Sequence, residues 1–416
     1  MRNITAEIIT VGDELLYGQT LDTNSHYMSQ KLDEAGFSVK YRVTVGDVAK
    51  DMNEAFAQAE SRSDVTLITG GLGPTEDDLT KPLLADFFNS EMAINEEALA
   101  EVTEYFESRG RKLTELNRGQ ALLPVKCTKI RNRYGTAPGM LFERNGKVFV
   151  SMPGVPREMR PMVVEEVIPE LKKHFELPAI AHRIIRTVGI GESFLADKIK
   201  DWAQALPKEI ALAYLPEEGQ VKLRMTAKGS DHGTLKNLID EAEGKLLPMI
   251  QEYVYGYGEE SLEEAIGKIL IEKNKTLATA ESCSGGRVAS KITSIAGSSA
   301  YFQGSVVAYQ NSVKEKVLGV NLDTISEHGA VSEQTVREMA EGVRGLLNAD
   351  IGLASSGIAG PGGGTEEKPV GTVWIACATA SGVETKLLHL GKFRQNNIEL
   401  TAVHLLNLAR KCLAKN

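Results

Sequence analysis

Short apolar runs alternate with amphipathic stretches at the start of the chain. The runs at 7–11, 39–45 and 65–69 predict strands, and the spacing of apolar residues at 24–35 predicts a helix between the first two. Strands that alternate with helices in this way form a parallel sheet with helices on both faces. We therefore predict a doubly wound α/β domain over residues 1–172.

The pattern changes near residue 178, where the regular alternation of strands and helices ends. Strands are predicted at 210–215 and 221–227, and a helix follows from His232. Residues 173–256 are therefore predicted to form a small α+β domain.

A second α/β series begins after a turn at 255–259. A helix is predicted at 261–272, and strands follow at 276–280, 304–309, 351–355 and 372–378. We predict a third domain over residues 257–416. The fold class is then α/β, with two doubly wound domains flanking a small α+β domain.

Composition limits the classes of function. The chain has 416 residues, 42% hydrophobic and 25% charged, which is typical of a soluble multidomain protein. Its net charge of −9 argues against extensive nucleic-acid binding, because neutralising phosphates takes clustered Lys and Arg. The four cysteines include no CxxC pair, which indicates neither a disulfide framework nor a thiolate zinc site. Without a secretory signal or a long apolar run, we expect a cytoplasmic protein that does not enter a membrane.

A glycine-rich segment, Gly70-Gly71-Leu72-Gly73, follows the predicted strand at 65–69. Glycines let backbone N–H groups approach a phosphate at the start of a helix, and Thr75 is a suitable N-cap for that helix. The acids that follow, at 76–78, have two interpretations. They complement the helix dipole in its first turn, or they supply oxygen ligands to a divalent cation.

Two further loops follow predicted strands and carry similar residues, at 12–14 and at 153–156. Loops at the carboxyl ends of parallel strands converge on one crevice, so we predict one site for phosphate and metal. Asp22 is a candidate ligand and equally a helix cap. The predicted phosphate-binding residues are Gly12, Gly70, Gly71, Gly73, Thr75, Pro153 and Gly154. The predicted ligands of Mg²⁺, Mn²⁺ or a similar ion are Glu14, Asp22, Glu76, Asp77 and Asp78.

These motifs resemble the molybdopterin-binding-like domain of the competence/damage-inducible CinA family, and the resemblance continues along the whole chain. It implies either a metal-dependent ADP-ribose pyrophosphatase or a degenerate pterin-binding fold in the first domain, and we favour the pyrophosphatase. For the middle domain it implies a KH-like fold. The GxGE turn there, at 189–192, lacks the basic residues that clamp a nucleic-acid backbone, so we expect a spacer or dimerisation role.

Hydroxyl side chains cluster in the last domain, first in the segment Glu281-Ser282-Cys283-Ser284-Gly285-Gly286. The segment follows a strand and opens a helix, which predicts an anion or oxyanion site; the alternative is a plain helix with Ser284 as N-cap. The stretch from 296 to 314 adds further serines, a tyrosine and a lysine. Hydrolysis of an amide without a metal needs an activated nucleophile, and a neutral, desolvated lysine can act as its base.

This stretch, with the segments at 355–364 and 368–373, closely resembles the nicotinamide-nucleotide amidase domain joined to CinA proteins. The resemblance implies Ser299 as nucleophile, Lys314 as general base, and Ser282 with Tyr309 as the relay that aligns them. Ser284 and Ser356 stand where the family commonly has threonine. We rank Cys283 below the serines, since a buried inert thiol is the commoner case.

Arg394 suits a 5′-phosphate because its planar guanidinium pairs with phosphate oxygens, and glycines between 357 and 364 let backbone amides approach the ligand. The predicted substrate contacts are Ser284, Gly285, Gly286, Ser356, Gly357, Gly360 and Arg394.

The resemblance thus implies an enzyme of pyridine-nucleotide salvage. Its amidase would convert nicotinamide mononucleotide (NMN) to nicotinate mononucleotide and ammonia without a cofactor, and its first domain would cleave ADP-ribose with a divalent metal. A homodimer is expected. The alternatives are a nucleotide- or pterin-binding protein with a silent N-terminal half, and a non-enzymatic factor in competence or recombination.

Overall fold

The computed structural model describes residues 2–75 and 77–415. The chain divides into two compact units, here called unit 1 and unit 2. Unit 1 comprises the residues up to Ala181 together with Lys228–Lys236, and unit 2 comprises His182–Ala227 together with the residues from Asn237 onward. Each unit is described by itself. In the described part of the chain, no helix is long and apolar enough to cross a membrane.

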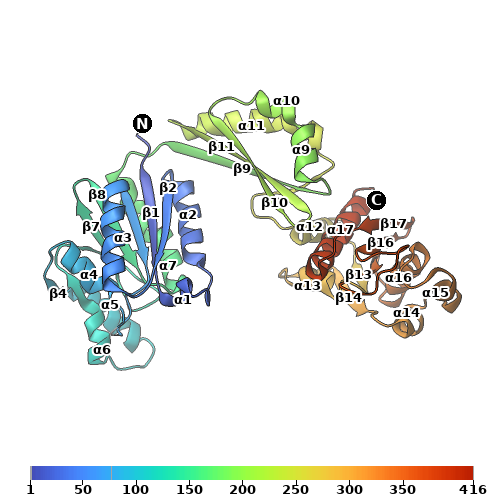
Figure 1. Cartoon of the computed structure of the whole chain (residues 1–416), viewed down its shortest axis with the longest axis horizontal. Coiled ribbons are helices and arrows are strands. Elements are labelled where there is room, and N and C mark those ends of the chain that lie inside the picture. Colours follow the sequence, from blue (N-terminus) through green and yellow to red (C-terminus); the bar gives the residue numbers. More distant parts are fainter. Residues whose placement is uncertain (1, 76, 416) are drawn as a thin grey trace. The chain divides into compact units, whose positions relative to one another are not determined.

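A six-stranded sheet forms the centre of unit 1 (Figure 1), and its strands lie in the order β2-β1-β3-β8-β7-β6. The first four strands in this order are mutually parallel; β7 runs antiparallel to β8, and β6 runs antiparallel to β7. A short antiparallel pair, β4-β5, is separate from it. The strands are β1 (Thr5–Val11), β2 (Ser38–Val45), β3 (Val65–Thr69), β4 (Met92–Ile94), β5 (Leu122–Pro124), β6 (Thr128–Ile130), β7 (Gly139–Arg144) and β8 (Lys147–Met152).

Helices cover both faces of this sheet because successive strand residues point to opposite sides. In β1, Ile8 packs into a core with Met28 of α2 and Met159 of α7, whereas Ile9 packs into a second core with Phe56 of α3. The helices of unit 1 are α1 (Asp13–Leu16), α2 (Thr23–Ala35), α3 (Ala49–Arg62), α4 (Thr80–Phe87), α5 (Glu96–Glu107), α6 (Glu115–Arg118), α7 (Pro156–Met162) and α8 (Ile168–His174), with a 3₁₀ turn at Gly119–Ala121 and a π-helical turn at Val163–Val167.

A four-stranded sheet follows in the order β10-β11-β9-β12, with helices beside it. It contains the antiparallel hairpin of β10 and β11, in which Glu217 is paired with Gln220. This is the predicted small α+β fold. Its elements are β9 (Ala179–Val188), α9 (Glu192–Lys198), α10 (Lys200–Gln204), β10 (Ile210–Glu217), β11 (Gln220–Gly229), α11 (His232–Ile250) and β12 (Val254–Tyr257).

The last sheet has the order β14-β13-β15-β16-β17. Its first three strands are mutually parallel; β16 runs antiparallel to β15, and β17 runs antiparallel to β16. Its strands are β13 (Leu277–Glu281), β14 (Phe302–Val307), β15 (Ile351–Gly357), β16 (Thr372–Thr379) and β17 (Gly382–His389). Its helices are α12 (Leu262–Glu272), α13 (Arg287–Thr293), α14 (Asn311–Leu318), α15 (Leu322–His328), α16 (Glu333–Leu346) and α17 (Arg394–Lys415).

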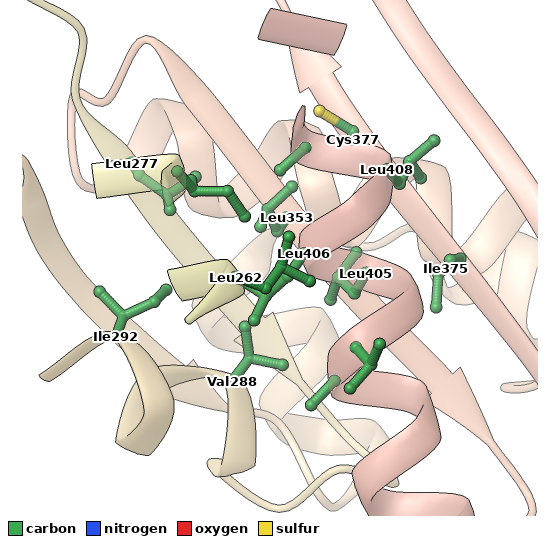
Figure 2. Packing of buried hydrophobic residues seen from close by; sticks show 14 of the residues in the cluster. Leu262, Leu277, Val288, Ile292, Leu353, Ile375, Cys377, Leu405, Leu406 and Leu408 are labelled. Atoms are coloured by element: carbon green, nitrogen blue, oxygen red, sulfur yellow. The ribbon is translucent and has the colours of Figure 1, made fainter. Parts of the chain in front are cut away.

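The long helix α17 is a main part of the core on one face of this sheet. Figure 2 shows Leu405 and Leu406 of α17 packed against Leu262 of α12, Val288 of α13 and Leu353 of β15. The opposite face is covered by α16 through a separate cluster. The predicted fold class, two doubly wound α/β domains and a small α+β domain, is therefore confirmed.

Two local predictions were wrong. The helix after the glycine-rich segment begins at Thr80, so Thr75 is not its N-cap. Instead, the Asp78 carboxylate accepts hydrogen bonds from the backbone N–H groups of Gly73 and Thr75, which closes a turn ahead of the helix. The strand predicted at 304–309 lies at Phe302–Val307, which leaves Tyr309 in a loop.

Glu7 is an acid in the middle of the buried strand β1, with a fully buried side chain. Its carboxylate accepts hydrogen bonds from Arg62 Nε and Nη2, at 2.9 and 2.6 Å, and from the Ser63 hydroxyl. The ion pair with Arg62 offsets the free-energy cost of burying the charged Glu7 carboxylate in the core.

We expect Arg62→Met to destabilise unit 1 by about 3 kcal/mol, because it leaves the Glu7 carboxylate buried without its partner. Hydrogen exchange of the β1 and β3 amides would measure the loss within this unit. The double variant Glu7→Leu/Arg62→Met should recover most of the loss. Equal exchange in the parent and Arg62→Met would contradict the role of the pair.

Candidate active site

A cavity of about 300 Å³ opens in unit 2 where the carboxyl ends of β13 and β15 lie next to the start of α17. It brings together seven of the residues predicted to bind or react, from segments that are far apart in the sequence. They are Ser282, Tyr309, Lys314, Ser356, Gly357, Gly360 and Arg394.

Lys314 lies on α14 but is only 1% exposed, which is unusual for a lysine. Its Nζ donates a hydrogen bond to the Ala308 carbonyl at 2.8 Å and lies 3.2 Å from Ser282 Oγ. Burial lowers the pKa of Lys314, because desolvation disfavours the charged amine. The arrangement places a base beside a serine hydroxyl.

Glu281, the last residue of β13, is a functional residue that the sequence analysis did not identify. Its fully buried carboxylate accepts hydrogen bonds from the backbone N–H groups of Gly286, Val288 and Ala289, at 2.8–3.0 Å. It thus caps the start of α13. The signal was available, since an acid that ends a strand just before a helix suits the positive helix end.

This cap corrects the predicted anion or oxyanion site at the start of α13. The N–H groups that would bind an external anion are already bonded to Glu281. Ser284 is buried, donates to Glu281 at 2.8 Å, and is not the N-cap, since α13 begins at Arg287. The backbone N–H of Gly285 donates to the Ser282 carbonyl. Ser284, Gly285 and Gly286 do not line the cavity and instead shape the turn that presents Ser282.

The structure does not bring Ser299 to Lys314. Ser299 is exposed in the 3₁₀ turn Ser298–Ala300, immediately before β14. Because β14 runs parallel to β13, with Phe302 opposite Leu277, this turn lies at the amino end of the strands. Ser282 and Lys314 follow the carboxyl ends. The predicted pairing of Ser299 with Lys314 within one chain is therefore wrong, and Ser282 is the serine that Lys314 contacts.

Tyr309 lines the cavity, but its contact differs from the predicted relay. Its hydroxyl accepts a hydrogen bond from Arg394 Nη2 at 3.1 Å. Arg394 is the first residue of α17, and its Nη1 donates to the Gly360 carbonyl at 2.7 Å. A guanidinium at the N-terminus of a long helix combines a fixed charge with the helix dipole, which suits an anion.

Ser356 and Cys283 also line the cavity. The Ser356 hydroxyl donates to the Ala330 carbonyl at 2.6 Å, so its oxygen remains available as an acceptor. Burial raises the pKa of Cys283 to about 12, which keeps the thiol protonated and supports its low rank as a nucleophile. Asn311 also lines the cavity and was not predicted; it precedes Lys314 by one turn of α14.

A larger cavity, of about 620 Å³, lies in unit 1 where the loops after β1, β3 and β8 converge, as predicted. Thr75 is not part of its lining. The predicted residues that do line it are Gly12, Glu14, Gly70, Gly71, Gly73, Asp77, Asp78, Pro153 and Gly154.

The predicted metal ligands have different surroundings. Asp22 caps α2 by accepting from Ser25 N at 2.9 Å, and Asp78 uses its oxygens to hold the turn before α4. Both therefore have structural partners. Glu76 lies outside the described residues. Among the described residues, no group of three or more His, Cys, Asp or Glu side chains is arranged to hold a metal ion.

Asp47, which was not predicted, joins Glu14 and Asp77 in the lining of this cavity. Burial raises the pKa of Asp47, and the nearby charges of Asp13, Glu14 and Asp77 raise it further. The neighbouring charges thus disfavour the ionised form of Asp47, whereas a hydrogen bond from the Asp13 backbone N–H favours it. The signal was Asp47's position just after β2, which parallels that of Asp13 after β1.

Three family models match successive parts of the chain. "Probable molybdopterin binding domain" matches residues 7–173, "Damage-inducible protein CinA KH domain" matches 182–256, and "CinA C-terminal domain" matches 259–413. The CinA-like protein of Cytophaga hutchinsonii is 48% identical over 411 residues, which cover 99% of this chain and 98% of that protein. The CinA-like protein of Flavobacterium psychrophilum is 43% identical over 413 residues, which cover 99% of each. Among solved structures, the competence/damage inducible protein CihA from Agrobacterium tumefaciens is 36% identical, with 37% of this chain and 97% of that chain covered and a TM-score of 0.35.

We expect Glu281→Gln to destabilise unit 2 by about 2 kcal/mol, because an amide replaces the charged acceptor of three backbone N–H groups. Faster hydrogen exchange of the α13 amides would show that stability is lost at the start of this helix. Glu384→Gln is the matched control: Glu384 pairs with Lys415 at the surface, and its loss should change stability by less than about 0.5 kcal/mol. Similar values for the two variants would contradict the capping role of Glu281.

Proposed function

Because the chain belongs to the CinA family of competence/damage-inducible proteins, we propose that its C-terminal domain is an amidohydrolase that converts NMN to nicotinate mononucleotide and ammonia. The observation that carries the proposal is the buried Lys314 amine, 3.2 Å from the Ser282 hydroxyl. The same cavity contains the Arg394 guanidinium. The role first given to Ser299 passes to Ser282.

In the proposed reaction, Ser282 Oγ attacks the carboxamide carbon while neutral Lys314 accepts the hydroxyl proton. The hydrogen bond from Lys314 Nζ to the Ala308 carbonyl orients the amine, so that the lone pair on Nζ can accept the proton of the Ser282 hydroxyl. Lys314 then gives the proton to the departing nitrogen, which leaves as ammonia. Water, deprotonated by the same lysine, attacks the acyl-serine; the lysine returns this proton to Ser282 Oγ as the carboxylic acid leaves, which restores both groups.

Arg394 is proposed to bind the 5′-phosphate of the substrate. Its guanidinium is held by Gly360 and Tyr309, so its orientation is fixed before the substrate arrives. The N-terminus of α17 adds a favourable field for the phosphate. Gly357 and Gly360 let the backbone line the cavity closely.

A binding protein without catalysis accounts less well for Lys314. Burying an amine so that its pKa falls costs stability, and a ligand contact alone does not require it. A lysine that only binds a phosphate gains from keeping its charge. The desolvated amine next to a hydroxyl therefore favours an enzyme over a binding protein.

We also propose that unit 1 cleaves ADP-ribose with the help of a divalent cation. The supporting observation is that the Glu14, Asp47 and Asp77 carboxylates share a cavity with the glycine-rich segment, where burial and the charges of Glu14 and Asp77 raise the pKa of Asp47. A hard cation relieves such repulsion, and Mg²⁺ commonly takes one or two carboxylates together with substrate phosphates. One or two of these carboxylates, together with substrate phosphates, would hold such an ion, which when bound would polarise the pyrophosphate.

We expect Ser282→Ala and Lys314→Met to lower NMN deamidation at least about 10³-fold, because each removes one half of the nucleophile–base pair. Ser299→Ala is the matched control and should keep the parent rate, since Ser299 is not in the cavity. Ammonia release in the presence of a chelator would measure all three. Activity lost in Ser299→Ala but kept in Ser282→Ala would overturn the assignment.

The parent kcat/KM should fall as the pH is lowered through the pKa of Lys314, because only the neutral amine acts as the base. Since burial lowers this pKa, the midpoint of the fall in kcat/KM should lie at a lower pH than the pKa of a solvated lysine. A rate profile measured with NMN would test this. An acid limb near the ordinary lysine pKa would contradict a desolvated base.

We expect Asp47→Asn to reduce metal-dependent AMP release from ADP-ribose at least about tenfold and to raise the metal concentration needed for half-maximal activity. Glu34→Gln is the control, because Glu34 is an exposed acid that pairs with Lys31 on α2. A parent that releases no AMP with any divalent cation would refute the pyrophosphatase.

A further inference from the structure

Gln120 lies in the 3₁₀ turn Gly119–Ala121 and lines the large cavity of unit 1, although its side chain is only 2% exposed. In the part of the chain that the structure describes, its side-chain Oε1 is buried and has no hydrogen-bond partner. A buried carbonyl without a partner destabilises the protein, so such groups are usually satisfied in the working state. Gln120 lines the cavity, and rotation of its side-chain amide would present this acceptor to a molecule bound there.

The backbone around Gln120 is held firmly in place. Its own carbonyl accepts a hydrogen bond from the buried Lys81 Nζ at 3.1 Å, and the Ala121 carbonyl accepts one from Asn95 N at 2.8 Å. The side-chain amide is thus presented from a fixed turn. Pre-organised polar groups of this kind confer specificity, because little ordering is needed when a ligand binds.

The lining of the cavity indicates which ligand edge suits this amide. Its apolar part includes the buried residues Leu72 and Ala137, and its glycines allow backbone to approach phosphates. Every charged side chain in the lining is an acid: Glu14, Asp47, Asp77, Asp78 and Glu158. Hydrogen-bond acceptors therefore predominate in the lining, which favours a ligand base whose ring edge has an exocyclic amine over one whose edge has an oxo group.

We propose that Gln120 recognises the adenine edge of a nucleotide bound in this cavity. Its Oε1 accepts from the 6-amino group and its Nε2 donates to the adjacent ring nitrogen, the bidentate pairing that glutamine makes with adenine. The phosphates then extend toward the glycine-rich segment. The inference rests on the proposed nucleotide pyrophosphatase and adds the residue that selects the base.

Calorimetric titration of the full chain with AMP and with IMP, at one fixed Mg²⁺ concentration, tests the proposal. The two differ at position 6, where IMP has an oxo group. The parent should bind AMP at least about tenfold more tightly than IMP, and Gln120→Met should bind both with the weaker affinity. Gln58→Met, at an exposed position on α3, is the matched control and should keep the parent preference.

Thermal unfolding without nucleotide separates recognition from a structural role. Gln120→Met removes an unpaired buried carbonyl and keeps a similar volume, so its unfolding temperature should equal or exceed the parent's. A lower unfolding temperature would mean that the amide supports the fold, which would overturn the proposal. Equal affinities of the parent for AMP and IMP, tighter binding of GMP than AMP, or no binding of AMP would also overturn it.

The outcomes distinguish this inference from the proposed reaction. If the parent prefers AMP through Gln120 but releases no AMP from ADP-ribose, the reaction fails and the inference stands. If the parent cleaves ADP-ribose but binds AMP and IMP alike, the reaction stands and the inference fails.

Discussion

The C-terminal site depends on one buried carboxylate, that of Glu281. It ends β13 and bonds to three backbone N–H groups at the start of α13, so that strand and helix are joined through a charge-assisted network. Ser282 lies in the turn between them. Its position follows from this cap, and the Glu281 carboxylate occupies the helix end that would otherwise attract a substrate anion.

The remaining parts of the site come from other elements of the same unit. Lys314 reaches Ser282 from α14, and its burial supplies the lowered pKa that a base needs. Arg394 comes from the first turn of α17, whose apolar residues are embedded in the core. The stability of that core thus fixes both the reactive pair and the anion-binding group, which is why residues so distant along the chain can act together.

In unit 1, loops rather than a buried helix cap bring the residues of the site together. The carboxyl ends of its parallel strands collect acids and glycines into one cavity. One acid of the lining already serves the fold, because Asp78 holds the turn before α4. Asp22 caps α2 and lies outside this lining. The repulsion that raises the pKa of Asp47 arises only because loops after different strands meet. Gln120, from a segment with no motif of its own, also lines this cavity.

The sequence by itself determined the fold class and the type of most elements that it predicted, because hydrophobic periodicity reflects local geometry and burial. It also placed the glycine-rich segment, seven residues of the C-terminal cavity and nine of the cavity in unit 1, because motifs at strand ends meet wherever parallel strands are aligned. It could not determine which serine Lys314 contacts. Ser299 is closer to Lys314 along the chain, but β14 carries the two to opposite ends of the sheet, whereas β13 brings Ser282 to the same end. Only the tertiary structure decided this, together with the burial of Glu281 and Gln120, because both depend on strand register and packing between segments that are distant in the sequence.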